Sequence, residues 1–396
     1  MRRSLACTIL IVLGVTALYD VAAQNEGLFP FEPAAGDLRI LTWNIELLGR
    51  RNPLRSEEQL LEIAARIETF DAAVVAVQEI TSENPQVVPR ERPALDTVVN
   101  ALGWQTAIGD WSNGFIYDPA KVELLERDTL EQLRFPPYST FYDDFPNWQT
   151  DFGPSGAPFG NENSLPELAI FRAVDGRSQP FCLISTHFIF GSANEFIRAY
   201  EGAALKLYID ERYADLAFTP AIYLMGDFNA RPTAGSPHDV LQANYPLNYI
   251  PKENTTITTA VGSGAELDHI YTTDEAYWTI ETGLAFVVRP SHYGETNEEF
   301  EATFSDHTPV FVDTLPLPFV SPIYVDNATT EPGLGTVEAP LRSFAEAVTA
   351  AYDGFTLNLA PGFYAIADKE SLLISKTLEL VNSNPAGGTV VVGASD

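Results

Sequence analysis

The sequence predicts an α/β protein built as a layered sandwich, in which helices and buried sheets pack in successive layers. Three observations support this fold class. Helical and apolar strand patterns alternate in the first half of the chain, whereas strands dominate later. Most of the strands are short apolar runs bounded by Gly, Pro or Asp, as expected for buried strands. A hydrophobic content of 45% also excludes a wholly disordered chain.

The elements of the sandwich follow from the spacing of apolar residues along 38–314. Helices are predicted over 56–70, where Ser56 can cap the first turn, and over 195–213. Segment 136–165 is rich in Pro, Gly, Asn and aromatic residues, which is typical of a long ordered loop. We predict strands at 38–44, 72–77, 114–117, 168–171, 181–186, 221–225, 270–271 and 310–312.

The character of the chain changes after a Pro-rich linker at 315–322. From 323 to 396, short β runs separated by Gly-containing turns follow one another closely, with one helix predicted over 341–352. This spacing predicts stacked coils of a β-solenoid, with the helix capping its open end.

Residues 1–23 have the pattern of a secretory signal peptide. Arg2 and Arg3 precede an apolar stretch, and Val21-Ala22-Ala23 is a small-residue cleavage site. The apolar stretch is short for a membrane span, which needs about 20 residues, so an uncleaved anchor is the weaker alternative. We therefore expect a secreted or periplasmic protein, exported by the general or the twin-arginine route, with no stable membrane insertion after cleavage. Residues 24–37 then form an N-terminal linker.

Acidic and imidazole side chains gather at the ends of the predicted strands. Gly226-Asp227-Phe228-Asn229 follows one apolar run, and Ser305-Asp306-His307 precedes another. Such groups at buried strand ends are costly unless a site uses them. Taken singly, each has a structural alternative as a turn residue, a cap or a core histidine, but the ordered set favours a site. The other strand ends of this kind carry Asn44, Glu79, His187 and Asp268.

Together these motifs resemble the endonuclease/exonuclease/phosphatase superfamily, which includes pancreatic-type deoxyribonucleases, inositol phosphatases and secreted sphingomyelinases. The resemblance covers roughly 38–314 and implies a four-layered α/β sandwich with two packed β-sheets flanked by helices. The matching motifs are Thr42-Trp43-Asn44-Ile45, Val77-Gln78-Glu79, Ser185-Thr186-His187, Gly226-Asp227-Phe228-Asn229-Ala230-Arg231-Pro232, Leu267-Asp268-His269-Ile270 and Ser305-Asp306-His307-Thr308-Pro309.

The resemblance implies a Mg²⁺-dependent hydrolase acting on ester bonds, with Mn²⁺ or Ca²⁺ as alternative metals. Carboxylate oxygens are the ligands of such hard cations, which neutralise charge on a phosphoryl group. The family pattern assigns Glu79, Asp306 and Asn44 to the metal, and Asp227 and Asn229 to the attacking water. It assigns His307, oriented by Asp268, to the scissile phosphate, His187 as a second imidazole there, and Asn113 to substrate binding.

Departures from the deoxyribonuclease pattern leave the substrate open. Thr81 and Ser164 stand where pancreatic-type deoxyribonucleases carry Arg, and Asn113 resembles the sphingomyelinase and deadenylase branches. The net charge of −31 repels nucleic acid at low salt, although at 1 M salt the Debye length is only about 3 Å. Either the habitat is salty or the substrate is not a long polyanion.

Three functions remain as predictions. The first is a nuclease-like phosphodiesterase that acts as a monomer. The second is an inositol-phosphate phosphatase or a sphingomyelinase/phospholipase C-like enzyme. The third, from another class, is a non-catalytic adhesion or glycan-binding protein that keeps the sandwich as a scaffold.

Three further expectations concern residues outside the catalytic set. Arg198 and Glu201 are expected to form a surface pair on the helix that follows His187, and His269 is expected to be structural. Segment 323–396 resembles the opening of right-handed parallel β-helix, pectate-lyase-like domains. Since a solenoid needs about three stacked repeats, we expect this segment to be a truncated module without a catalytic set.

Overall fold

The computed structural model describes the sandwich and much of the C-terminal segment. None of the helices within the described residues is long and apolar enough to cross a membrane. The predicted signal peptide, most of loop 136–165, Thr81 and Ser164 lie outside the described residues. The residues described are 33, 36–49, 54–80, 91–109, 112–134, 159, 165–174, 176, 178–191, 194–213, 221–232, 237–242, 247–253, 258–261, 264–280, 282–317, 319, 322–330, 333–337, 339–351, 355–366, 378–383 and 390–394.

Two mixed β-sheets pack face to face, and inward-facing residues of both form one core between them. The first sheet has the order β11 (Phe286–Val287), β12 (Val310–Thr314), β1 (Leu38–Leu48), β2 (Val74–Ile80), β4 (Gly114–Tyr117), β3 (Gln105–Ile108). The second has the order β5 (Val122–Thr129), β6 (Glu167–Ala173), β7 (Phe181–His187), β8 (Ala221–Asp227), β10 (Asp268–Thr272), β9 (Asn248–Tyr249).

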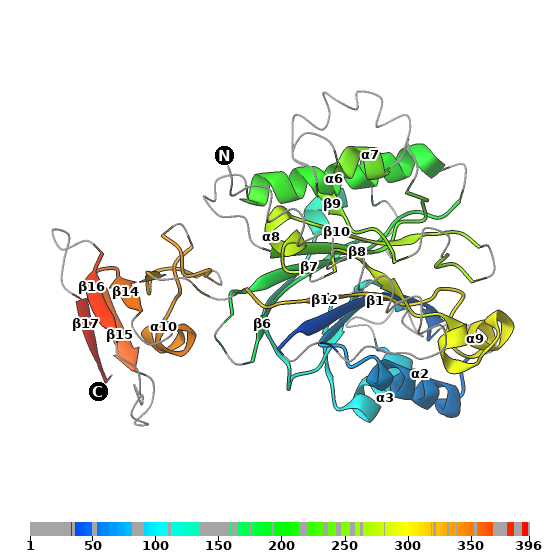
Figure 1. Cartoon of the computed structure of the whole chain (residues 1–396), viewed down its shortest axis with the longest axis horizontal. Coiled ribbons are helices and arrows are strands. Elements are labelled where there is room, and N and C mark those ends of the chain that lie inside the picture. Colours follow the sequence, from blue (N-terminus) through cyan, green and yellow to red (C-terminus); the bar gives the residue numbers. More distant parts are fainter. Residues whose placement is uncertain are drawn as a thin grey trace, which may run out of the picture.

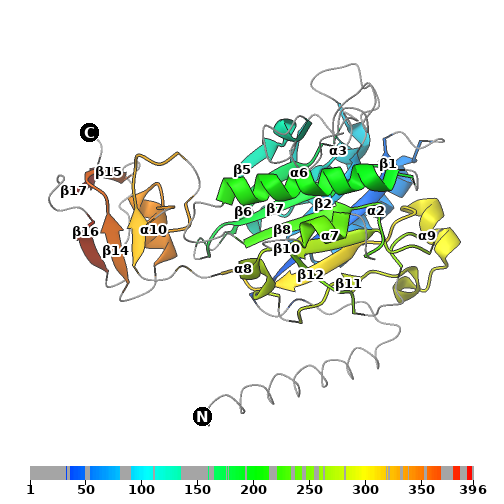
Figure 2. The same ribbon diagram turned by 90° about the horizontal axis from the view of Figure 1, so that it is seen from above.

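Helices cover the outer face of each sheet (Figure 1). On the first sheet lie α2 (Glu57–Thr69), α3 (Pro93–Leu102) and α9 (Asn297–Thr303), and on the second lie α6 (Glu195–Tyr213) and α7 (Pro237–Leu241). Figure 2 shows α6 and α7 running side by side over β7 and β8. The connections carry the short helices α8 (Asp274–Tyr277), η1 (Glu131–Arg134) and η4 (Pro290–Tyr293). The predicted α/β sandwich of two sheets flanked by helices is confirmed.

Alternation of side chains along the central strands explains the layers. In β1, Ile40 faces the core between the sheets, whereas Leu41 and Trp43 pack beneath the helices of the first sheet. The expected cap of α2 is present, because Ser56 Oγ accepts the Gln59 N–H at 3.2 Å in a capping box.

The sheet topology brings four strand ends to one edge of the sandwich. Strands β1 and β2 are parallel neighbours in one sheet, and β7 and β8 are parallel neighbours in the other. Gln78 joins the two sheets near this edge, donating from Nε2 to Ser185 Oγ at 2.9 Å. Strands β7 and β8 approach so closely that a Cβ on Gly226 would lie 1.9 Å from the Thr186 carbonyl oxygen. The residues that follow these strands are therefore held close together.

The C-terminal segment is a separate unit in Figures 1 and 2, where it lies beyond one end of the sandwich. Among its described residues the strands pair in parallel, in the orders β13 (Ile323–Val325), β14 (Thr356–Leu359), β16 (Glu379–Asn382) and β15 (Gly362–Ile366), β17 (Val390–Ala394). Helix α10 (Phe344–Ala350) packs on Ile323 and Leu357 in a small core. Membership of the parallel β-helix family and the domain boundaries stay predictions.

Candidate active site

The predicted site residues gather at or beside the edge where β1, β2, β7 and β8 end. Two of them, Asp306 and Asn113, are described separately below. The other seven are joined by hydrogen bonds or ion pairs into one chain of contacts: His307, Asp268, Asp227, Asn229, Asn44, Glu79 and His187.

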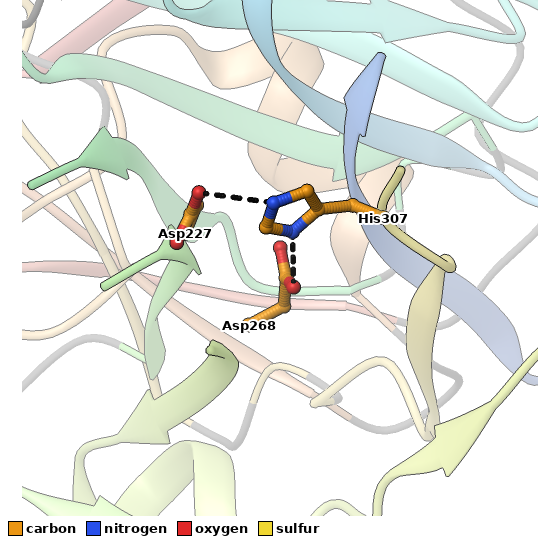
Figure 3. A group of neighbouring side chains, drawn as sticks. All are labelled: Asp227, Asp268 and His307. Carbon is orange, nitrogen blue, oxygen red and sulfur yellow. Dashed lines mark hydrogen bonds and ion pairs between the residues drawn. The ribbon is translucent and has the colours of Figure 1, made fainter. Parts of the chain in front are cut away.

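His307 lies between two buried carboxylates (Figure 3). Its Nδ1 is 2.7 Å from Asp268 Oδ2, and its Nε2 is 3.6 Å from Asp227 Oδ2. Asp227 ends β8 and Asp268 begins β10, and the two are register partners in the antiparallel pair. The Trp43 indole donates to the His307 carbonyl at 2.9 Å. His307 is therefore held both at its imidazole ring and at its main-chain carbonyl.

The two carboxylates hold a proton on His307. Burial lowers the pKa of His307, but the anions of Asp268 and Asp227 outweigh burial and raise this pKa well above its ordinary value. Burial raises the pKa of Asp227, and the charge of His307 opposes that effect. A protonated imidazole donates from both nitrogens, so Nδ1–H points to Asp268 and Nε2–H faces Asp227.

Asn44 links the carboxylates of the two sheets. Its Nδ2 lies 3.1 Å from Glu79 Oε1 and 3.1 Å from Asp227 Oδ2. Its Oδ1 accepts the Glu46 N–H at 3.1 Å, which sets the orientation of the amide. In this orientation Asn44 offers hydrogen-bond donors to the two carboxylates, and binding a metal through Oδ1 requires the amide to turn over.

Backbone strain is concentrated around these groups. Glu46 (φ 32°), Glu79 (φ 58°) and Asn229 (φ 48°) have the left-handed conformation that side chains other than Gly rarely adopt. Such strain persists where the surrounding structure over-determines it, and functional sites are its usual location.

The donors at this edge fit a hard divalent cation. Glu79 and Asp227 direct carboxylate oxygens at the same neutral amide of Asn44, and a cation would neutralise the two anions. A second group, Asp227, Asp268 and His307, has potential ligand atoms within 4.8 Å of one another. A protonated His307 has no lone pair for a metal, so the donors on the Glu79 side fit a cation better than this second group does.

Asn229 and His187 complete the surroundings of Asp227. The Asn229 N–H donates to Asp227 Oδ1 at 2.8 Å, and Asn229 Nδ2 donates to the Phe188 carbonyl at 2.8 Å. His187 Nε2 lies 3.6 Å from Asp227 Oδ2 and 3.9 Å from Glu79 Oε1. Asp227 is therefore approached by donors from several elements at once.

Asp306 and Asn113 are the two predicted site residues outside the chain of seven contacting residues. Asp306 Oδ1 lies 3.5 Å from Ser305 Oγ, and its charge contributes to the raised pKa of His307. Asn113 is fully buried before β4 and donates from Nδ2 to the Leu165 carbonyl at 2.9 Å. Their assignments to metal and to substrate stay predictions.

Ser305 and Thr259 support the site, although their side chains had no role in the sequence-based predictions. Ser305 Oγ donates to the Asn44 carbonyl at 2.6 Å and accepts the His307 N–H at 3.1 Å. Thr259 Oγ1 accepts the backbone N–H groups of Leu267 and Asp268. Ser305 belongs to a recognised motif, Ser305-Asp306-His307, which is a usable signal, whereas nothing in the sequence around Thr259 distinguishes it.

The expectation that Arg198 and Glu201 form a surface pair is wrong. Both are buried, with exposed fractions of 6% and 1%. Glu201 Oε2 accepts the Ile189 N–H at 3.0 Å, while Arg198 donates to the carbonyls of Ile189 (3.1 Å) and Gly191 (2.8 Å). These ionisable side chains are buried where they satisfy the main chain of the loop that follows His187.

Comparison with known proteins identifies relatives of the sandwich. A family model described as the endonuclease/exonuclease/phosphatase family matches residues 41–307. The human Nocturnin catalytic domain is 14% identical, with 72% of this chain and 96% of that chain covered and a TM-score of 0.46. An endonuclease/exonuclease/phosphatase from Bacteroides vulgatus is 15% identical, with 70% and 98% covered and a TM-score of 0.48. A Bacteroides thetaiotaomicron mannosyl-6-phosphatase is 15% identical, with 69% of this chain and 98% of that chain covered and a TM-score of 0.44. A search of curated proteins finds no match.

Proposed function

The chain belongs to the endonuclease/exonuclease/phosphatase family, whose members hydrolyse phosphoester bonds, and from that membership we propose an exported, divalent-metal-dependent phosphodiesterase of the nuclease-like kind. The observation that carries the proposal is the hydrogen bond of 2.7 Å between His307 and the buried carboxylate of Asp268. It makes His307 a fixed cation beside Asp227, and a fixed cation is what a phosphoryl group with growing negative charge requires.

The neighbouring groups divide the remaining work. Asp227 accepts the Asn229 N–H through one carboxylate oxygen, which leaves the other oxygen directed toward the two imidazoles and the Asn44 amide. There it can orient a water molecule and take its proton. His307 Nε2–H binds a phosphoryl oxygen or protonates the leaving oxygen. When bound at Glu79, a divalent cation neutralises charge on the phosphoryl oxygens.

The choice of Mg²⁺ over Mn²⁺ and Ca²⁺ belongs to the proposal. Oxygen donors from carboxylates suit each of these hard cations, and Mg²⁺ is proposed because it commonly works with one or two carboxylates plus substrate phosphate.

A second candidate function is favoured by the charge of the molecule. With 54 acidic and 23 basic residues the protein repels a long polyanion, so an inositol phosphate or a phospholipid headgroup such as that of sphingomyelin is the alternative substrate. The non-catalytic scaffold is disfavoured, because strained backbone and buried charges at the site are costs that a scaffold does not need.

Export and a monomeric state complete the proposal. Export is supported by the signal pattern in residues 1–23. The monomeric state stays a prediction.

The test offers the purified chain plasmid DNA, RNA, sphingomyelin and inositol phosphates, with Mg²⁺ or Mn²⁺ at low and high salt. We expect cleavage of nucleic acid at high salt, loss of at least about 10²-fold in the Glu79→Gln variant, and no loss in an exposed control, Glu58→Gln. Cleavage of only the lipid or the inositol phosphates would transfer the assignment to the second candidate. Failure to cleave any ester would contradict both.

A further inference from the structure

Two histidines converge on one carbonyl oxygen next to the turn Asp227–Asn229, which is called the catalytic turn below. His269 Nε2, from β10, lies 2.8 Å from the Ala230 carbonyl oxygen, and His238 Nε2, from α7, lies 3.3 Å from the same atom. Ala230 immediately follows Asn229. Both rings are buried, with exposed fractions of 0% for His269 and 2% for His238.

The proton positions on both rings follow from their partners. A carbonyl oxygen only accepts, so each Nε2 must carry the hydrogen. His269 Nδ1 then accepts from Lys252 Nζ, which lies 3.1 Å away. As an ammonium group, Lys252 has no lone pair and can act only as a donor. His238 Nδ1 accepts the hydroxyl of Tyr271. Each histidine is thus a neutral donor, and the group that donates to its Nδ1 fixes its tautomer.

The charge behind His269 is itself buried and paired. Lys252 Nζ is 2.8 Å from Glu266 Oε1, which also accepts the Tyr249 hydroxyl at 2.8 Å. Burial and the neighbouring Lys252 lower the pKa of His269 well below its ordinary value, in agreement with the neutral ring. The network therefore presents a donor, and no net charge, to the Ala230 carbonyl.

The packing of the Phe228 ring also holds the catalytic turn. Its ring packs on Phe188, Tyr271 and the two histidines, with centroid distances between 4.9 and 6.2 Å. Asp227 and Asn229 lie on either side of Phe228 in the chain. The side chain of Phe228 and the carbonyl of Ala230 are both held by the network.

We propose that His269, assisted by His238, is a positioning residue that fixes the Asp227–Asn229 turn by donating to the Ala230 carbonyl. The positioning role rests on the proposed phosphoesterase function. It goes beyond the expectation that His269 is structural, with which the buried ring agrees, because His269 and His238 aim two donors at one acceptor next to a left-handed Asn229.

The direct test is hydrogen exchange at the Asn229 amide, whose N–H is bonded to Asp227 Oδ1. In His269→Ala we expect exchange at this amide to quicken by about tenfold or more, since the turn opens locally. His269→Gln keeps an N–H donor near the Nε2 position and should restore slow exchange.

Ile222→Ala is the matched control. It removes part of a buried side chain from the hydrophobic cluster that also contains Phe228, but at the far end of β8. Local opening does not depend on global stability, so this control should keep slow exchange at Asn229. Unchanged exchange in His269→Ala, or equal quickening in Ile222→Ala, would overturn the positioning role.

A kinetic arm separates this inference from the function on which it rests. On a substrate that the wild type cleaves, we expect His269→Ala to lower kcat by about tenfold or more, with KM within about twofold and kcat restored by Gln. A kcat equal to that of Ile222→Ala would overturn the inference. If the wild type cleaves nothing, the proposed function fails, and the exchange experiment still decides the positioning role.

Discussion

His307 and Asp268 form the hydrogen bond on which the chemistry depends. In Asp268→Asn the anion is lost, so the pKa of His307 should fall and the alkaline limit of kcat should move to lower pH. We expect kcat near neutral pH to fall by about 10²–10⁴-fold. The pKa is measured by NMR titration of the imidazole, and kcat by a pH series. Asp274→Asn, at the exposed start of α8, is the matched control, and an unmoved alkaline limit in Asp268→Asn would contradict the assignment.

Glu167 in β6 makes stability depend on pH. Burial raises the pKa of Glu167 to about 7, although Thr129 Oγ1 (2.6 Å) and Arg127 (2.9 Å) contact its carboxylate. Between the ordinary value of 4.5 and about 7, the folded chain binds more protons at this site than the unfolded chain. The contribution of Glu167 to the free energy of unfolding therefore falls as pH rises through this window, by roughly 2–3 kcal/mol.

Glu167→Gln should remove that part of the pH dependence. Urea unfolding of the wild type and the variant at several pH values between 4.5 and 8 measures it, with Glu58→Gln on the exposed face of α2 as control. Parallel pH profiles for Glu167→Gln and the wild type would show that the raised pKa has no effect on folding.

Among the elements, the loop that leaves β7 depends on two buried ionisable side chains of α6, Arg198 and Glu201. Burial raises the pKa of Glu201 well above its ordinary value, and its carboxyl still accepts the Ile189 N–H. Glu201→Ala removes this acceptor, so we expect a loss of about 1–3 kcal/mol in the free energy of unfolding and lower activity through His187. Urea unfolding provides the measurement. Glu195→Ala, exposed on the same helix, should change stability by less than about 0.5 kcal/mol, and an equal loss in both variants would contradict the role of Glu201.

Elements with local signals could be predicted from the sequence. The apolar strands 72–77 and 221–225 and the Ser56 cap are present as expected, because periodicity and capping chemistry are local. Helix α3 and the edge strand β5 were not predicted. Strand β5 is largely half-exposed and polar, so its position depends on pairing with β6 and not on its own sequence.

In the candidate site, the residues that stand in motifs could be predicted from the sequence, and the residues that support them could not. Asp227, Asp268 and His307 stand in recognisable motifs, and the structure brings them together. The roles of Thr259 and Glu201 were not predictable, because their partners Asp268 and Ile189 come close only when strands and loops assemble. A buried side chain that serves a distant main-chain group leaves no periodic signal.

At the scale of the whole molecule, the acidic excess predicts salt-dependent stability. A net charge of −31 destabilises the compact state by self-repulsion, and raising salt from 0.1 to 1 M shortens the Debye length from about 10 to about 3 Å. We expect the urea midpoint of unfolding to rise with KCl across this range. A midpoint that is constant or falls would show that the acidic surface imposes no net cost.

The central claim is that the cluster around His307 hydrolyses phosphoesters with the help of a divalent metal. Hydrolysis of bis-nitrophenyl phosphate by the purified full chain tests this claim most directly, in Mg²⁺ and in excess chelator, with His307→Ala and with the control His292→Ala in η4. We predict metal-dependent hydrolysis in the wild type and the control, and a loss of at least about 10²-fold in His307→Ala. Equal rates in the wild type and His307→Ala, or no hydrolysis by the wild type with metal, would contradict the claim.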